Sequence, residues 1–528
     1  MICSSTDYTH TCQSSLTKVV KSNNPDPKEL VKAAISVIFN EVGAAFNKTN
    51  LIKTNDTHIK GAIEDCRELF RSSNDELHAS LNLIIDRGID QLPDQSHNIR
   101  TWLSAVMSYQ QTCIDGFPDG DLKKRMNEGM RHARELTSNA LAIVKQAAKY
   151  MEMLNVDGLI GKRRLLEDVE DVEEEETATA EDDELPSWMP EGDRRTLKEK
   201  SHDKVKLSLK PNVTVAKDGS GQFKTISAAL ENMPQKYNGR YVIYVKPGVY
   251  DETVMVTSTM KNVTIYGDNA TNTIITGNKN YIDGTRTFQT ATFCHFGHGF
   301  MAMGLTIRNN AGAIKHQAVA LRVQSDRSLF LNCNFEGYQD TLYAQTHRQF
   351  YRACVISGTI DFIFGDASAI FQNCLILVRR PLDNQQNIVT AQGRVDRHEN
   401  TGFVLQRCRI VPDPSLKPVA EKFRSYLGRP WKEHSRIVIM ESEIGDLISP
   451  EGYMPWEGEF ALKTLSYSEY KNTGPGSDFK ARVKWPGIKL FEKDEAELFT
   501  ATNFIQVRDW VKKTGYGVKV PLRLGLYG

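Results

Sequence analysis

The sequence predicts two domains of different class: an N-terminal all-α four-helix bundle in residues 1–160 and a C-terminal all-β right-handed parallel β-helix in residues 207–528. Two observations predict them, apolar residues three and four apart in the first part and a repeat of about 20 residues in the second. A third, a dense acidic run, predicts a linker in residues 161–206. A chain of 528 residues is also too long for one ordinary core.

The helical part contains four amphipathic segments. They cover residues 28–45, 59–85, 98–113 and 122–153, and prolines fall between them. Long helices joined by short connections pack as antiparallel neighbours, so we expect a bundle.

Four cysteines lie in this part, and they allow three pairings. Cys3 and Cys12 are close together on what we expect to be a non-helical lead-in, whereas Cys66 and Cys113 lie on two different predicted helices. We therefore expect the bridges Cys3–Cys12 and Cys66–Cys113.

The linker opens with a dibasic motif, Arg163, Arg164, Leu165 and Leu166. Residues 165–206 then contain 16 acidic and 6 basic side chains, a difference of −10. Such a segment repels itself and buries no core, so it is exposed. The dibasic pair is then either a site for a processing protease or simply the basic end of a helix.

One pattern recurs in the second part, at residues 329–335 (LFLNCNF), 349–356 (QFYRACVI), 369–376 (AIFQNCLI) and 403–410 (FVLQRCRI). Its cysteines are 21, 20 and 34 residues apart, and the longer step is one coil with an inserted loop. Short strands at this period, with no helices between them, indicate a parallel β-helix in which each coil stacks on the next. Stacked cysteines could form a bridge, and we expect Cys354–Cys374.

Two carboxylates have the spacing of one coil. Asp340 lies in residues 337–343 (GYQDTLY) and Asp361, 21 residues later, in residues 358–365 (GTIDFIFG). Neighbouring coils place such side chains about one strand spacing apart. Apolar neighbours raise the pKa of one carboxyl and so separate an acid from a base. The alternative, that each Asp caps a turn, fits the apolar flanks less well.

Amide and cationic side chains accompany the two acids. Gln339 precedes Asp340, and Gln317 lies 22 residues before Gln339. Two amide donors near a carboxylate pair suit an oxyanion, although a structural Gln ladder is the alternative. In residues 427–431 (LGRPW), Arg429 supplies a cation for a carboxylate and Trp431 an aromatic face for a sugar ring.

These motifs, together with residues 317–320 (QAVA), resemble the signature set of plant pectin methylesterases, and the resemblance covers essentially all of residues 207–528. The helical part resembles the pectin methylesterase inhibitor family, whose cysteine placement matches this sequence. Residues 163–166 (RRLL) resemble the processing motif that subtilisin-like proteases recognise in this family.

The resemblance implies a role for each matching residue. Asp361 is the nucleophile and Asp340 the general acid and base. Gln317 and Gln339 stabilise the oxyanion, and Arg429 keeps Asp361 ionised. Trp431 stacks on the sugar, and Thr287 lies where the family contacts substrate. The family requires no cofactor, and the histidines of this sequence form no metal-ligand pattern.

Charge, sequons and cysteines bear on partner and location. Residues 207–528 contain 39 Lys and Arg against 30 Asp and Glu, a difference of +9, which suits a polyanion. Nucleic acid, an anionic membrane and an acidic polysaccharide all fit that charge. The resemblance selects methyl-esterified homogalacturonan and implies neither nucleic acid nor membrane as a partner. It also implies that proteinaceous pectin methylesterase inhibitors bind the enzyme. Sequons at Asn47, Asn55, Asn212, Asn262 and Asn269 indicate a secreted cell-wall glycoprotein, and we therefore expect a leader that this sequence does not include to precede residue 1.

Two other readings compete with this one. A polygalacturonase or pectate lyase would need clustered acids spaced for a water molecule, or calcium-binding carboxylates, in place of the paired Asp, Gln and Arg set. A secreted regulatory protein would act through the bundle and use the β-helix only for binding, a role that would not need both acids and Arg429.

Overall fold

The structure, a computed structural model, describes residues 2–20, 25–49, 52–87, 91–156, 209–513, 520 and 522–527. These residues divide into a helical unit and a β unit, and the acidic linker with its dibasic motif lies outside them. Within the described residues, no helix combines the length and the apolar character needed to cross a bilayer.

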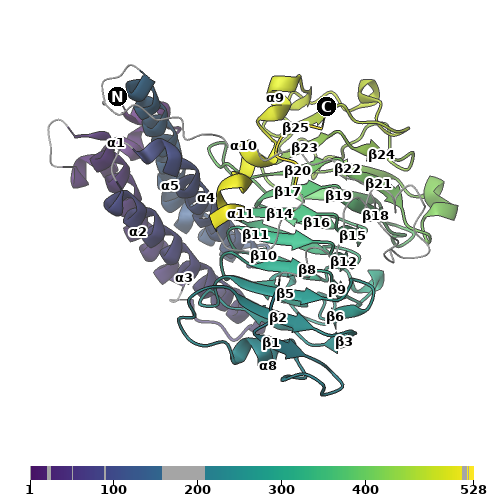
Figure 1. Ribbon diagram of the computed structural model, residues 1–528. Helices are drawn as coiled ribbons and strands as arrows, with labels where there is room; N and C mark the ends of the chain where they lie inside the picture. Colours follow the sequence, from purple (N-terminus) through teal and green to yellow (C-terminus); the bar gives the residue numbers. More distant parts are fainter. Residues whose placement is uncertain are drawn as a thin grey trace. The chain divides into compact units, whose positions relative to one another are not determined.

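The helical unit is a bundle of four long helices preceded by two short ones (Figure 1). Their bounds are η1 (Ile2–Ser5), α1 (Thr9–Val19), α2 (Pro27–Thr49), α3 (Thr57–Asp86), α4 (Leu92–Asp115) and α5 (Asp121–Val156). Helix α2 packs against α3 and α5, and α4 packs against the same two helices. The core face of α2 carries Val31, Ile35, Ile38 and Val42, all fully buried. This spacing of three and four residues confirms the periodicity that predicted the bundle.

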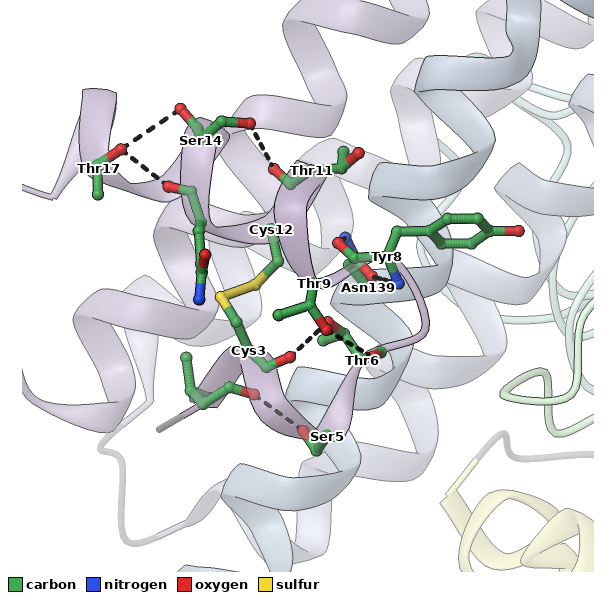
Figure 2. Close-up of a disulfide and its surroundings, with 12 residues drawn as sticks. Cys3, Ser5, Thr6, Tyr8, Thr9, Thr11, Cys12, Ser14, Thr17 and Asn139 are labelled. Atoms are coloured by element: carbon green, nitrogen blue, oxygen red, sulfur yellow. Dashed lines mark hydrogen bonds between the residues drawn. A yellow bond between two sulfur atoms is a disulfide. The ribbon is translucent and has the colours of Figure 1, made fainter.

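The two disulfides of the bundle are Cys3–Cys12 and Cys66–Cys113. The lead-in that holds the first is helical, which the sequence analysis did not expect: Cys12 and Leu16, one turn apart, are both buried on α1. Figure 2 shows this bridge, with the backbone of Tyr8 held by the side chain of Asn139 through hydrogen bonds of 3.3 and 3.0 Å. The segment therefore packs on α5 instead of running free.

The β unit is a parallel β-helix of three sheets (Figure 1). The first contains β1 (Val213–Val215), β2 (Tyr241–Val245), β5 (Val263–Gly267), β8 (Met301–Met303), β11 (Ser328–Leu331), β14 (Arg348–Arg352), β17 (Ser368–Gln372), β20 (Gly402–Gln406), β23 (Arg436–Met440), β25 (Ser466–Tyr470) and β26 (Ile488–Leu490). The second contains β4 (Val254–Val256), β7 (Phe293–His295), β10 (Leu321–Gln324), β13 (Leu342–Thr346), β16 (Ile363–Gly365), β19 (Asn387–Gln392) and β22 (Ser425–Gly428). The third contains β3 (Gly248–Asp251), β6 (Thr273–Gly277), β9 (Thr306–Asn309), β12 (Asn334–Glu336), β15 (Val355–Gly358), β18 (Leu375–Val378), β21 (Arg409–Pro412) and β24 (Glu443–Ile444).

Short helices complete this unit. They are α8 (Ile226–Glu231), η3 (Thr287–Gln289), η4 (Ala313–Lys315), η5 (Lys417–Lys422), η6 (Phe479–Ala481), α9 (Lys493–Glu497), α10 (Ala501–Ile505) and α11 (Val507–Lys513). Apolar side chains of α10 and α11, such as Phe504 and Trp510, cover the outer face of the first sheet. Among the described residues, both large apolar clusters of the β unit draw their members from residue 209 onward, so this core does not include the bundle.

The coil period has the length that the cysteine repeat predicted. Strands β11, β14, β17 and β20 are consecutive neighbours in one sheet, and the 34-residue step between Cys374 and Cys408 is a single coil with an insertion. The side chains of Cys333, Cys354, Cys374 and Cys408 consequently stack inside the β-helix, where all four are buried.

The expected bridge Cys354–Cys374 is wrong, because both thiols are free. Equivalent residues of parallel neighbouring strands point the same way and lie one strand spacing apart, about 4.8 Å. A disulfide needs Cβ atoms about 3.8 Å apart and a near-perpendicular twist between the two side chains. Each thiol instead donates to a carbonyl of the preceding coil, Cys354 to Phe330 and Cys374 to Tyr351, both at 3.5 Å.

We predict five free thiols and four bridged cysteines. Alkylation of the denatured, unreduced chain followed by intact-mass measurement should therefore show five labels, and nine after reduction. Three labels before reduction would show that a third bridge forms within the cysteine stack.

Candidate active site

The candidate catalytic residues meet on the second sheet because its strands are stacked in register. Asp340 and Asp361 each lie two residues before a strand, β13 and β16, and Leu342 pairs with Ile363 across these strands. The same register aligns the two acids. The amide of Asp340 donates to the carbonyl of Ile360 at 3.0 Å, so the two corners are in direct contact.

Both acids are buried in a strained backbone conformation. Asp340 is 8% exposed and Asp361 6% exposed. Their φ angles, 63° and 50°, lie in the left-handed region that side chains other than glycine rarely adopt. Left-handed residues also occur at corners away from the acids, such as Asn332, Ala353 and Asn373, so this conformation follows from the sharp corners of the coils.

Arg429 clamps one acid and not the other. Its Nε donates to Oδ1 of Asp361 at 2.8 Å and its Nη2 to Oδ2 at 2.6 Å, a bidentate ion pair. Arg429 directly follows β22, two coils beyond Asp361, so its side chain reaches back across the coil of β19 to the acid.

The two carboxyls therefore differ in proton affinity. Burial raises the pKa of Asp340 well above its usual range; the nearby charge of Asp361 raises it further, and Arg429 opposes the shift only in part. Burial also raises the pKa of Asp361, but the charge and hydrogen bonds of Arg429 counteract it. Asp340 thus binds a proton more readily, which leaves Asp361 as the anion of the pair.

The two glutamines lie beside this pair. The amide of Ala318, next to Gln317, donates to the carbonyl of Gln339 at 3.2 Å, so the segments run side by side. The side-chain oxygen of Gln339 is buried and has no hydrogen-bond partner within the described part of the chain. Gln317 and Gln339 thus lie on neighbouring coils, next to the corner that carries Asp340.

An aromatic wall borders the site. The rings of Tyr343 and Phe364 stack with centroids 4.3 Å apart, and Trp431 meets Phe364 edge-on at 5.9 Å. Gly393 makes room for the indole, because a Cβ there would lie 2.7 Å from Cε3 of Trp431. The indole of Trp431 therefore packs closely against Gly393, and Trp431 remains half-buried.

Thr287 belongs to η3, which is tied to the Gln317 segment. Its carbonyl accepts from Thr290 Oγ1 at 2.8 Å, and that hydroxyl accepts from the amide of Val319 at 3.0 Å. The guanidinium of Arg322 lies 3.3 Å from the ring centroid of Phe288 and donates to its carbonyl. These contacts hold Thr287 near the first glutamine.

Trp456 is a site neighbour that the sequence analysis missed. Trp456 lies on the loop between β24 and β25, and the guanidinium of Arg429 lies 4.3 Å from the centroid of its ring. Tyr343 and Phe364 were also missed as a wall, although both lie inside the quoted motifs and occupy equivalent positions on adjacent coils. These equivalent positions in the two motifs were the signal from which the wall could have been predicted. Trp456 has no counterpart on another coil.

Other predicted sites lie elsewhere. Residues 163–166 are outside the described residues. Among the sequons, Asn47, Asn55 and Asn212 are exposed, while Asn262 and Asn269 are half-buried. Across the described ranges, no group of three or more His, Cys, Asp or Glu side chains is placed to hold a metal ion.

Comparison with known proteins agrees with this geometry. Residues 212–508 match the family model Pectinesterase, and residues 1–143 match Plant invertase/pectin methylesterase inhibitor. A putative pectinesterase/pectinesterase inhibitor 45 from Arabidopsis thaliana is 49% identical over 100% of this chain and 84% of its own length. Pectinesterase 3 from Citrus sinensis is 41% identical over 99% of this chain and 88% of its own.

Solved structures match as well. Pectin methylesterase from carrot is 50% identical, with a TM-score of 0.59 over 60% of this chain and 99% of that one. The Aspergillus niger enzyme is 28% identical, with a TM-score of 0.50 over 58% of this chain and 97% of that one. The fold and these matches define a carboxylic ester hydrolase built on a parallel β-helix. The chain belongs to the pectinesterase family and carries an inhibitor-family domain at its N-terminal end.

We predict opposite stability effects for the two acids. Above the pKa of Asp340, the wild type holds a buried carboxylate beside Asp361, so Asp340→Asn should raise the thermal midpoint of residues 207–528 by a few degrees. Below that pKa the wild-type carboxyl is itself protonated and the gain should vanish. Asp361→Asn breaks the pair with Arg429 and should cost about 3–5 kcal/mol at neutral pH. Calorimetry across a pH series measures both, and equal shifts for the two variants would contradict the assigned asymmetry.

Proposed function

We propose that this protein hydrolyses the methyl esters of homogalacturonan, with Asp361 as nucleophile and Asp340 as general acid and base. One observation carries the assignment: Arg429 holds Asp361 in a bidentate ion pair, while its neighbour Asp340 has no such pair with any described residue and has a higher pKa. A carboxylate kept ionised and oriented is the nucleophile, and a carboxyl kept protonated is the acid.

In the first half of the reaction, an oxygen of Asp361 attacks the ester carbonyl of a galacturonate residue. The carbonyl oxygen becomes an oxyanion, for which the amide groups of Gln317 and Gln339 are the donors. The intermediate then expels the methoxy group, which takes the proton of Asp340 and leaves as methanol. The sugar remains bound to Asp361 as a mixed anhydride.

In the second half, Asp340 is a carboxylate and accepts a proton from a water molecule. The resulting hydroxide attacks the acyl carbon of the anhydride, and the bond to Asp361 breaks. The galacturonic acid group is released and loses a proton to the solvent, while Asp361 is again an anion paired with Arg429 and Asp340 is again protonated. Asp340 has then given one proton to methanol and taken one from water, which balances the cycle.

Substrate contacts follow from the surroundings of the acids. Trp431 offers an aromatic face for a sugar ring, and Thr287 a hydroxyl on the neighbouring segment. The excess of basic over acidic residues in residues 207–528 favours a polyanionic polymer over a neutral one. The stacked coils supply an extended surface on which several sugars of one chain can lie.

We predict that Asp361→Asn and Asp340→Asn each reduce methanol release from esterified pectin by about 1,000-fold or more. The first removes the nucleophile and the second the proton donor, while an amide has nearly the same shape. Steady-state assays of residues 207–528, with circular dichroism to confirm folding, check both. Near-normal turnover in either folded variant would remove that residue from the mechanism.

We further propose that the protein is a zymogen secreted to the cell wall as a glycoprotein. The domain boundaries at residues 160 and 207, cleavage after residues 163–166 by a subtilisin-like protease, and inhibition by the attached bundle or by separate inhibitor proteins all belong to this proposal. Its support is the inhibitor-family match in residues 1–143, the dibasic motif and the sequons.

The charge split predicts a salt-dependent mask on the uncleaved chain. Residues 165–206 of the linker, with a difference of −10, are tethered to a domain with a difference of +9, at an effective concentration on the order of millimolar. It should compete with pectin at low salt, and screening should weaken that competition because the Debye length is about 10 Å at 0.1 M.

Pectin binding by the full chain and by residues 207–528 should therefore differ most at low salt and converge as salt rises. Glu173→Gln, Glu174→Gln, Glu175→Gln and Glu176→Gln, made together in the full chain, should narrow the gap without touching the dibasic motif. Equal affinity of the two proteins at low salt would contradict electrostatic masking.

A further inference from the structure

Three successive coils present equivalent corners beside the site. Glu336 pairs with Ser357, and Gly358 pairs with Val378, so Tyr338, Thr359 and Arg379 occupy the same position on consecutive coils. The first two corners lead within two residues to Asp340 and Asp361. The third ends the strand β18 and contributes no acid.

Arg379 reaches back from the third corner to the first. Its Nη1 donates to the carbonyl of Gly337 at 2.9 Å and its Nη2 to the hydroxyl of Tyr338 at 3.0 Å. The guanidinium also lies 3.9 Å from the ring centroid of Tyr338. The amide of Arg379 donates to Gly358 at 2.8 Å. Arg379 therefore forms hydrogen bonds to both coils that carry the paired acids.

The far side of the guanidinium is also held. A carboxylate oxygen of Asp413 lies 3.6 Å from Nε of Arg379, and the amide of Asp413 donates to Val378 at 2.9 Å. The Arg379 side chain is 26% exposed, so it is neither a free surface cation nor a core residue. A planar fork fixed on three sides is a rigid brace.

The corners that Arg379 contacts are packed so closely that the backbone has little room to shift. A Cβ on Gly358 would lie 2.7 Å from the carbonyl oxygen of Tyr338, so the two corners already touch. That same oxygen accepts from the amide of Thr359 at 3.0 Å. After these contacts, each of the two corner segments leads into an Asp with left-handed backbone, Asp340 in one and Asp361 in the other. A shift of Tyr338 would therefore move Gln339 and Asp340 relative to Asp361.

We propose that Arg379 is a positioning residue that sets the placement of Gln339 and Asp340 against Asp361, an inference that rests on the proposed function. It acts through Gly337 and Tyr338 and does not itself reach the reacting atoms. Misplacing a proton donor by about 1 Å costs on the order of 100-fold in rate, whereas sugar binding at Trp431 and Thr287 is left in place. The loss should appear in kcat and not in KM.

The neighbouring arginine provides a matched control. Arg380 has a 49% exposed side chain, pairs with Asp383 at 3.3 Å and lies 5.9 Å from the ring centroid of Phe423. It resembles Arg379 in chemistry and in its place along the chain, but its contacts lead away from the Tyr338 corner.

The experiment compares Arg379→Ala, Arg379→Lys and Arg380→Ala in residues 207–528, whose core among the described residues does not include the bundle. We expect Arg379→Ala to lower kcat on the order of 10- to 100-fold with KM within about threefold. Arg379→Lys should recover part of the loss, and Arg380→Ala should stay within about twofold of wild type. A loosened Asp340 loses part of its burial, so the alkaline limb of the kcat profile should also move to lower pH in Arg379→Ala.

Each outcome is decisive. Equal kcat in the two alanine variants, or a change confined to KM, would overturn the inference while leaving the ester hydrolase intact. No methanol release from wild type and Arg380→Ala would instead contradict the proposed function. If Arg379→Ala fails to fold, Tyr338→Phe removes only the hydroxyl that accepts from Arg379, and its loss of kcat should be non-additive with that of Arg379→Lys. Additive losses would overturn the brace.

Discussion

Parallel stacking in register is the constraint on which the rest of the β unit depends. Leu342 pairs with Ile363 and Ile363 with Thr390, and each step adds one strand spacing of about 4.8 Å. Residues one coil apart in the sequence therefore lie one strand spacing apart along the site. Asp340 and Asp361 become neighbours with no long loop to bring them together, and the same rule stacks the aromatic rings beside them.

The site then resolves an electrostatic conflict that stacking creates. Two carboxylates forced side by side and away from water cannot both ionise cheaply. Arg429 is the cation that the described residues place on this pair, and its two hydrogen bonds commit it to Asp361. The unequal sharing of one positive charge gives two chemically identical side chains different protonation, and so different roles.

Periodicity explains what the sequence could predict. The spacing of the two acids and of the four stacked cysteines follows from the coil length, so the fold and the Asp pair were predictable from a single chain. The same regularity defeated the expected Cys354–Cys374 bridge, since equal spacing makes the side chains parallel. Trp456 acts from a loop with no counterpart on other coils, and the contact of Arg379 with Gly337 reaches back across two coils, so neither contact leaves a period in the sequence.

The stacking also determines where the chain can change length. Between Gln317 and Asp361 the coils keep nearly constant length, with one register shift between β10 and β13, and a deletion within a strand there would send its later core side chains to the outer face until the next corner. The 68 residues from Asp361 to Arg429 include the loops on either side of β19, which leave the strand registers untouched. Insertions and deletions that reshape the polymer's path should therefore accumulate after the nucleophile, so that new groove shapes can evolve around an acid pair of invariant spacing.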